Sequence, residues 1–251
     1  MRPSTHVRAN SRPLTVSGDS ARSDVSDAAT VSHPANATWP EWDEWDARTE
    51  ICKVGQRLYH HFFVAANDGN ISVRLNEDEI IITPTNVSKG FMNPEDMIKL
   101  GMDGRLIASR TGRNASSERR MHLAIYKHRP DIRAVVHAHP PTATGLAVAG
   151  IGLDRPFLPE TVVRTGPCPL VPYAIPGGDE LPDSIIPYLR DHITLLLGNH
   201  GAVAYAPTLT DAAFNMESIE LNARIFLVAS QVGHINYLTE EQMAALRVRY
   251  A

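Results

Sequence analysis

The chain has 251 residues, of which 43% are hydrophobic and 21% are charged. This composition is typical of a globular domain and argues against collagen-like, coiled-coil and wholly disordered proteins. The 24 basic and 28 acidic side chains give a formal net charge of −4, which argues against a general nucleic-acid-binding protein or a polybasic membrane protein. The sequence has no apolar run of roughly 18–20 residues, the length of a membrane span, and its two cysteines form no CxxC motif. We therefore expect a cytoplasmic protein without nucleic-acid or membrane partners.

The first 38 residues differ in composition from the rest of the chain. They are rich in Ser, Thr, Ala, Arg and Pro and carry few large apolar side chains. Such a segment buries too little apolar surface to offset the entropy lost on ordering. We expect residues 1–38 to form a disordered N-terminal tail and residues 39–251 to form one folded domain.

The folded part begins with a helix and a hairpin. Apolar residues recur at three- and four-residue steps from Ile51 to Phe62, which predicts an amphipathic helix. Apolar side chains alternate over residues 71–75, and a second apolar run covers residues 79–83 after an Asn-Glu-Asp turn. These two runs predict a β-hairpin.

Further elements follow from capping residues and apolar runs. Helices are predicted to begin near residue 94 and to cover residues 117–128, 142–149 and 210–232. Apolar runs predict strands at residues 134–136, 195–197 and 202–204. Because hairpins outnumber βαβ crossovers, the pattern favours a mixed, largely antiparallel α/β sandwich over a Rossmann sheet.

Three histidines follow apolar runs. His137 and His139 end one predicted strand, and since alternate side chains of a strand share a face, their imidazoles are expected close together. His200 follows the next apolar run and precedes the conformationally permissive Gly201. Such a trio is typical of an open zinc-type site with room for water or substrate. On spacing alone, a surface or hydrogen-bonded histidine pair is the alternative.

Glu118 lies at the start of a predicted helix, where a carboxylate is stabilised by the helix dipole. Beside a metal it would instead fill a coordination position and act as a general base once substrate displaces it. His122 lies four residues further on, and we expect it to be a polar surface residue.

Three segments together can form a cradle for a phosphate or a carboxylate. Asn70 follows a glycine, Thr85 lies in a Thr-Pro-Thr turn, and Ser116 and Ser117 precede a helix whose first N–H groups are free. Each segment alone is a weak signal, so the prediction depends on their co-occurrence. Lys89 could add a cation, but a solvated lysine is the expected reading.

The order of these motifs resembles the class II aldolase/adducin family, which includes the L-fuculose-1-phosphate aldolase-like enzymes. The resemblance covers about residues 45–235 and rests on five blocks in the family's order, at residues 69–72, 83–85, 116–118, 137–139 and 199–201. It implies an α/β fold, a three-layer α/β/α arrangement around a mostly antiparallel sheet. It also implies a homo-oligomer, usually a tetramer with active sites between neighbouring subunits.

The resemblance assigns roles to individual residues. It implies that His137, His139 and His200 bind a divalent ion, Zn²⁺ first and Mn²⁺, Co²⁺ or Fe²⁺ as alternatives. It implies that Glu118 coordinates the resting metal and serves as acid and base. It further implies that a cluster of polar side chains holds the substrate phosphate, namely Asn70, Thr85, Ser116 and Ser117.

The activity implied is that of a metal-dependent aldolase-type lyase acting on a small phosphorylated or carboxylated substrate. Such an enzyme cleaves or forms a C–C bond in a phosphorylated ketose through a metal-stabilised enediolate. The same site could serve an epimerase, a decarboxylase or, with iron, an oxygenase, and the fold also occurs in adducin-like interaction modules without enzymatic activity. Family epimerases tend to carry Asp at position 118, which favours aldolase or decarboxylase here.

The chain departs from the aldolases at two places. Asn86 replaces the glycine that usually follows Thr-Pro-Thr, and since Asn tolerates a left-handed backbone, we expect the turn to survive. Residues 159–163 lack an aromatic residue, whereas the resemblance to fuculose-phosphate enzymes implies an acid/base tyrosine near this position. The resemblance therefore leaves the substrate and the second acid/base residue open.

Overall fold

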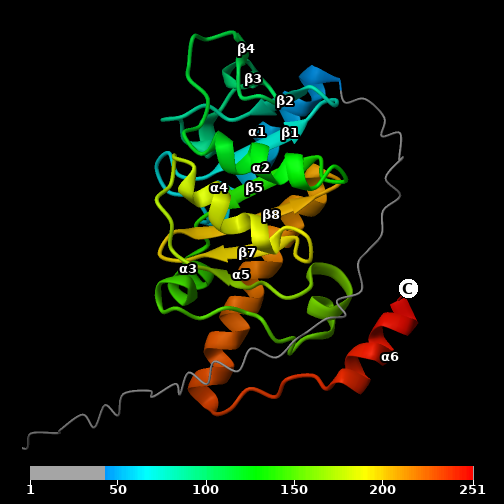
Figure 1. The fold of residues 1–251 in the computed structure, drawn as a ribbon. Helices are drawn as coiled ribbons and strands as arrows, with labels where there is room; N and C mark the ends of the chain where they lie inside the picture. Colours follow the sequence, from blue (N-terminus) through cyan, green and yellow to red (C-terminus); the bar gives the residue numbers. More distant parts are fainter. Residues whose placement is uncertain (1–42, 251) are drawn as a thin grey trace, which may run out of the picture. The chain divides into compact units, whose positions relative to one another are not determined.

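The computed structural model describes residues 43–250, so the expected disordered tail at residues 1–38 lies outside the described residues (Figure 1). The eight strands are β1 Asn70–Arg74, β2 Glu79–Ile82, β3 Ile98–Gly101, β4 Leu106–Ser109, β5 Ala134–Ala138, β6 Leu170–Val171, β7 Thr194–Leu197 and β8 Gly201–Ala206. The α-helices are α1 Glu44–His60, α2 Arg119–His128, α3 Pro141–Val148, α4 Glu180–Ile185, α5 Leu209–Val232 and α6 Glu240–Tyr250. Short 3₁₀ or π turns cover Lys89–Phe91, Pro94–Asp96, Thr161–Thr165 and Ile186–Tyr188.

The strands form one sheet in the order β4-β3-β2-β1-β5-β8-β7-β6. Neighbouring strands are antiparallel except β6 and β7, which pair in parallel. Both predicted hairpins are present, one between β1 and β2 and one between β7 and β8. The prediction of a mostly antiparallel central sheet is therefore confirmed.

Helices cover both faces of the sheet. Successive side chains of a strand point to opposite faces, and the neighbouring Val135 and Val136 of β5 accordingly belong to two separate apolar cores. The core on the Val136 side includes side chains of α1, α3 and α5, and the core on the Val135 side includes side chains of α2 and α4. The three-layer α/β/α arrangement is thus confirmed.

The ends of the helices differ slightly from the predicted ends. α1 begins earlier than its apolar pattern suggests, because the Asp43 carboxylate caps the N–H groups of Trp45 and Asp46. α5 begins at Leu209, since Thr208 and not Thr210 caps it through the N–H of Asp211. None of the helices within residues 43–250 is long and apolar enough to cross a membrane.

The register of the central strands brings polar side chains together at one end of the sheet. Asn70, the first residue of β1, lies directly opposite His137 near the end of β5. Residues paired across an antiparallel ladder share a face. Both side chains therefore point toward the layer that contains α2.

Candidate metal centre

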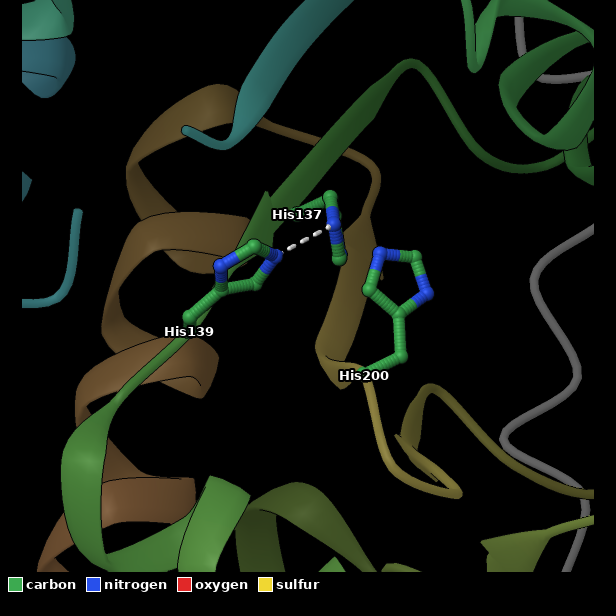
Figure 2. Close-up of side chains that lie close together, drawn as sticks. All are labelled: His137, His139 and His200. Carbon is green, nitrogen blue, oxygen red and sulfur yellow. Dashed lines mark hydrogen bonds between the residues drawn. The ribbon is translucent and has the colours of Figure 1, made fainter. Parts of the chain in front are cut away.

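The three predicted histidines meet at the end of β5 (Figure 2). His137 lies within β5, and His139 follows one residue after the strand ends. His200 lies in the turn that joins β7 to β8. One nitrogen atom of each ring lies within 4.8 Å of the others, and His137 Nε2 and His139 Nε2 are 3.2 Å apart. The turn before β8 departs from expectation in one respect: Asn199 and not Gly201 has the left-handed backbone, with φ of 53°.

Hydrogen bonding leaves the inner nitrogen of His137 free to bind a cation. His137 Nδ1 donates to the carbonyl oxygen of Ala202 at 2.9 Å. A neutral imidazole carries one N–H, so Nε2 keeps its lone pair. On the neighbouring ring, His139 Nδ1 faces the Asp68 carboxylate at 3.6 Å, which likewise leaves Nε2 on the inner side.

Glu118 lies immediately before α2 and completes the cluster. Its carboxylate oxygens are 3.3 Å from His137 Nε2 and 3.2 Å from His200 Nε2, and Asn70 Nδ2 donates to it at 2.7 Å. Burial by itself would raise the pKa of Glu118, but the two histidines and the Asn70 hydrogen bond lower that pKa well below its ordinary value. Glu118 is therefore an ionised carboxylate in contact with two imidazoles, those of His137 and His200.

The histidines differ in their protonation behaviour. Burial and the neighbouring His137 lower the pKa of His200 to about 4 and also lower the pKa of His139. Burial would lower the pKa of His137 too, but the Glu118 charge raises it. His139 and His200 are thus in the neutral, ligand-competent form at neutral pH, and the negative charge beside His137 favours a cation.

Two local features fit a bound metal ion. Glu118 Oε1 is buried and accepts no hydrogen bond from any residue in the described part of the chain, a costly state for a carboxylate oxygen without a counter-ion. The facing Nε2 atoms of His137 and His139 need a proton or a cation between them. Three imidazole nitrogens and one carboxylate oxygen form a donor set typical of Zn²⁺ and related divalent ions.

Asn70 and His122 lie deeper on the same side of the sheet. The Asn70 carboxamide contacts Glu118 on one side and His122 on the other, and both Asn70 and His122 are buried. The expectation that His122 is a surface residue is wrong, because α2 packs this side chain directly onto β1. The Asn70 side chain, predicted to hold phosphate, contacts the catalytic candidate Glu118.

The other predicted substrate residues lie in two loops that are bonded to each other. The N–H of Thr85 donates to the carbonyl of Asn114, and the N–H of Ser116 donates to the carbonyl of Thr83. Ser116 is buried and its hydroxyl accepts the N–H of Glu118, whereas Ser117 is exposed. The structure thus brings the Thr85 and Ser116 loops together beside Glu118, and their role toward phosphate stays a prediction.

Two residues beside these loops were described wrongly or missed by sequence reasoning. Lys89 is buried and not solvated, because its ammonium group donates to the carbonyls of Asn67 and Val87. Asp68 faces His139 but was not singled out, although its position immediately before the Gly-Asn block was a usable signal. Asn86 has φ of 59°, which confirms that asparagine sustains the left-handed turn where the aldolases carry glycine.

Comparison with known proteins places this site in a family. The family described as "Class II Aldolase and Adducin N-terminal domain" matches residues 49–227. The chain is 33% identical over 205 residues to the 3-oxo-tetronate 4-phosphate decarboxylase of Escherichia coli K12, an alignment that covers 80% of this chain and 94% of the relative. It is 31% identical to the 5-deoxy-D-ribulose 1-phosphate aldolase of Bacillus thuringiensis, covering 81% of this chain and 94% of the relative.

Solved structures show the same relationship. An L-fuculose 1-phosphate aldolase superposes with a TM-score of 0.76 at 28% identity, covering 82% of this chain and 96% of that structure. The family match, the shared fold and the three-histidine cluster all agree with the resemblance seen in the sequence. This chain belongs to the class II aldolase/adducin family.

Proposed function

We propose that this protein is a divalent-metal-dependent lyase that breaks a C–C bond in a small phosphorylated keto acid, with 3-oxo-tetronate 4-phosphate as the first candidate substrate. The observation that carries the proposal is the placement of the Glu118 carboxylate against His137 and His200, with His139 completing the trio. An interaction module has no need for three converging imidazoles beside an ionised carboxylate that is only 12% exposed, so this arrangement supports an enzyme.

The chemistry of such a substrate suits the site. Its carboxylate lies β to the ketone, so the electrons of the breaking C–C bond move toward the ketone oxygen as CO₂ leaves. His137, His139 and His200 would hold a divalent ion beside this oxygen, and the ion would supply positive charge that favours the negative oxygen. The carbon that loses CO₂ then needs a proton.

We assign this proton transfer to Glu118, which is ionised at rest and therefore takes a proton from water before passing it to the carbon. Two opposing influences act on its pKa, which burial raises and the adjacent histidines lower. The pKa of Glu118 therefore follows the charges beside it, and a change in those charges during the reaction changes its affinity for a proton. Asn70 keeps the carboxylate oriented by its hydrogen bond throughout.

The absence of an aromatic residue from residues 159–163 also favours decarboxylation over aldol cleavage. Aldol cleavage begins with removal of a proton from a substrate hydroxyl, which calls for a second base, and the aromatic residue expected there in fuculose-phosphate enzymes is absent from the sequence. A carboxylate that leaves as CO₂ carries no such proton, so decarboxylation does not need this second base. Aldol cleavage is the second candidate, supported by the 31% identity to a sugar-phosphate aldolase.

The ion and the assembly are part of the proposal. Zn²⁺ is favoured by the nitrogen-rich donor set. A homotetramer is the assembly that the family resemblance implies, and apolar side chains on the outer face of α5 support association between subunits. Leu221, Val228 and Val232 are 57%, 59% and 84% exposed, an arrangement typical of subunit contacts. Native mass spectrometry would show a tetramer if this holds and a monomer if it does not.

A substrate panel tests the activity. The full-length protein, loaded separately with Zn²⁺, Mn²⁺, Co²⁺ and Fe²⁺, is assayed for CO₂ release from 3-oxo-tetronate 4-phosphate and for aldehyde release from 5-deoxy-D-ribulose 1-phosphate and L-fuculose 1-phosphate. We expect CO₂ release to be the fastest and to stop on addition of a chelator. Faster aldehyde release would favour the second candidate, and turnover of none of the three substrates with any ion would overturn the proposal.

A further inference from the structure

A continuous set of buried polar side chains runs from the metal centre into the layer between α2 and β1. Glu118, His122 and Tyr126 are spaced by four residues and therefore share one face of the helical segment. Asn70 and Ser72 are spaced by two residues and share one face of β1. Hydrogen bonds alternate between the two elements, from Glu118 to Asn70, to His122, to Ser72 and to Tyr126.

The Glu118 carboxylate lies at one end of this set and fixes which atom donates in each hydrogen bond. The ionised Glu118 carboxylate can only accept, so the Asn70 amide must present its NH₂ group, at 2.7 Å. The amide oxygen of Asn70 then faces His122 Nε2, which must carry the ring proton to donate to it. The orientation of the amide and the tautomer of the histidine are thereby linked.

The remaining contacts agree with this direction. Burial, together with the nearby His137, lowers the pKa of His122 to about 3, so the ring is neutral and its Nδ1 is an acceptor. Ser72 Oγ lies 2.7 Å from His122 Nδ1 and 2.7 Å from Tyr126 Oη. The single Ser72 proton points to the histidine, so the Tyr126 hydroxyl donates to Ser72 at 2.7 Å rather than to the more distant carbonyl oxygen of Arg133 at 3.5 Å. Every donor therefore points toward Glu118.

We propose that His122 is a positioning residue, whose Nε2–H fixes the Asn70 carboxamide so that its NH₂ group holds the Glu118 carboxylate in place. Without the His122 Nε2–H group, the Asn70 carboxamide could rotate by half a turn. Its oxygen would then face the Glu118 carboxylate, and the two negative oxygens would repel each other. The inference rests on the proposed function in so far as Glu118 moves a proton. The tautomer of His122 is independent of any substrate.

Two substitutions at His122 separate positioning from packing. His122→Gln places an amide nitrogen where Nε2 lies and can still donate to Asn70, whereas the shorter side chain of His122→Asn reaches only the position of Nδ1. We expect the Gln variant to retain most of the wild-type kcat, while the Asn variant loses roughly 10–100-fold, the usual cost of removing a partner that orients a metal-site residue. Thr194→Val, which removes a buried hydroxyl of the same sheet outside this set, is the control and should keep its turnover.

Melting temperatures and metal content of both variants are measured alongside kcat. A purely structural role predicts that kcat follows stability, so equal kcat values for the Gln and Asn variants would overturn the inference. Nitrogen NMR of the imidazoles in the wild-type protein provides a test without substrate: we expect the His122 proton on Nε2, and a proton on Nδ1 would overturn the inference. If the wild-type protein turns over none of the substrates, the proposed function fails, while the NMR result still decides whether His122 carries the Nε2 proton that the inference requires.

Discussion

Gly201 lies against His139 so closely that no larger residue fits there. A Cβ atom on Gly201 would lie 2.5 Å from His139 Cδ2 and 2.6 Å from the carbonyl oxygen of Ala138. The glycine is thus required by the close approach of β8 to the end of β5, and not by a left-handed backbone. It lets a strand that begins beside His200 pack directly on the ring of His139.

Gly201→Ala should therefore disturb the histidine cluster. The added methyl group must displace either the His139 ring or the backbone of Ala138, so we expect divalent-metal affinity to fall roughly 10–100-fold, as it does when the support of a ligand is lost. Isothermal titration with Zn²⁺ measures the change. Gly145→Ala is the matched control, because a Cβ atom there meets nothing within 4 Å, and unchanged affinity in the Gly201 variant would show that the cluster tolerates the displacement.

Glu118→Gln tests the catalytic carboxylate. The substitution keeps the size of the side chain but removes its charge and basicity, so turnover should fall by about 10²–10⁴-fold, the usual contribution of a positioned acid or base. Folding should persist. If Glu118 merely stabilises the start of α2, stability should instead change by about 0.3–1 kcal/mol with nearly normal turnover. Steady-state kinetics together with thermal melts distinguish the two outcomes.

Lys89 should make stability depend on pH. Burial lowers the pKa of this lysine from 10.5 to about 8, with the Asp68 charge opposing the shift. Between these pH values the unfolded chain holds a proton that the folded chain lacks, so the free energy of unfolding should rise with pH. The rise should be at most about 3.5 kcal/mol, at about 1.4 kcal/mol per pH unit.

Urea unfolding of the wild type and of Lys89→Met between pH 7.5 and 10.5 checks this expectation. The Met variant should lose the rise that Lys89 causes, and Lys127→Met, at an exposed position, should retain it. Parallel pH profiles for the wild type and the Lys89 variant would contradict the assignment.

Deleting the first 38 residues should leave the folded domain intact. The segment carries little apolar surface to bury, and the family match begins only at residue 49. We expect the truncated and full-length proteins to share one melting temperature and one turnover number. A loss of several degrees on truncation would mean that the segment packs on the domain.

The spacing of apolar residues along the chain was sufficient to predict the helices and strands in which that spacing is regular. The apolar spacing of α1, the proline that follows α2, and the two hairpins are each determined by a few neighbouring residues. The predicted serine cap of α2 was wrong, because Glu118 occupies the N-cap position and its side chain makes no capping hydrogen bond. The parallel pairing of β6 and β7 could not be predicted in this way, because β6 has only two residues and its pairing depends on contacts distant in sequence. β4 was missed for another reason: its exposed Leu106 and Ile107 give no inward-facing alternation.

The metal centre was predictable in part. Strand alternation predicted that His137 and His139 lie close together. The position of His200 after another apolar run suggested that it joins them, and the family resemblance supported this placement. The burial of His122 and Lys89 could not be predicted from the sequence, because each is covered by an element far away along the chain. The four-residue spacing of Glu118, His122 and Tyr126 puts them on one helix face, and the two-residue spacing of Asn70 and Ser72 puts them on one strand face. These two spacings predict contacts only when it is known that α2 packs on β1.

The metal content of His139→Ala tests the central claim most directly. The claim is that His137, His139 and His200 together bind one divalent ion, so removing one of three neutral donors should weaken binding by orders of magnitude. Elemental analysis of the purified proteins should find about one ion per chain in the wild type and in the control His234→Ala, an exposed histidine away from the site, and little in His139→Ala. Full occupancy in His139→Ala would contradict the account.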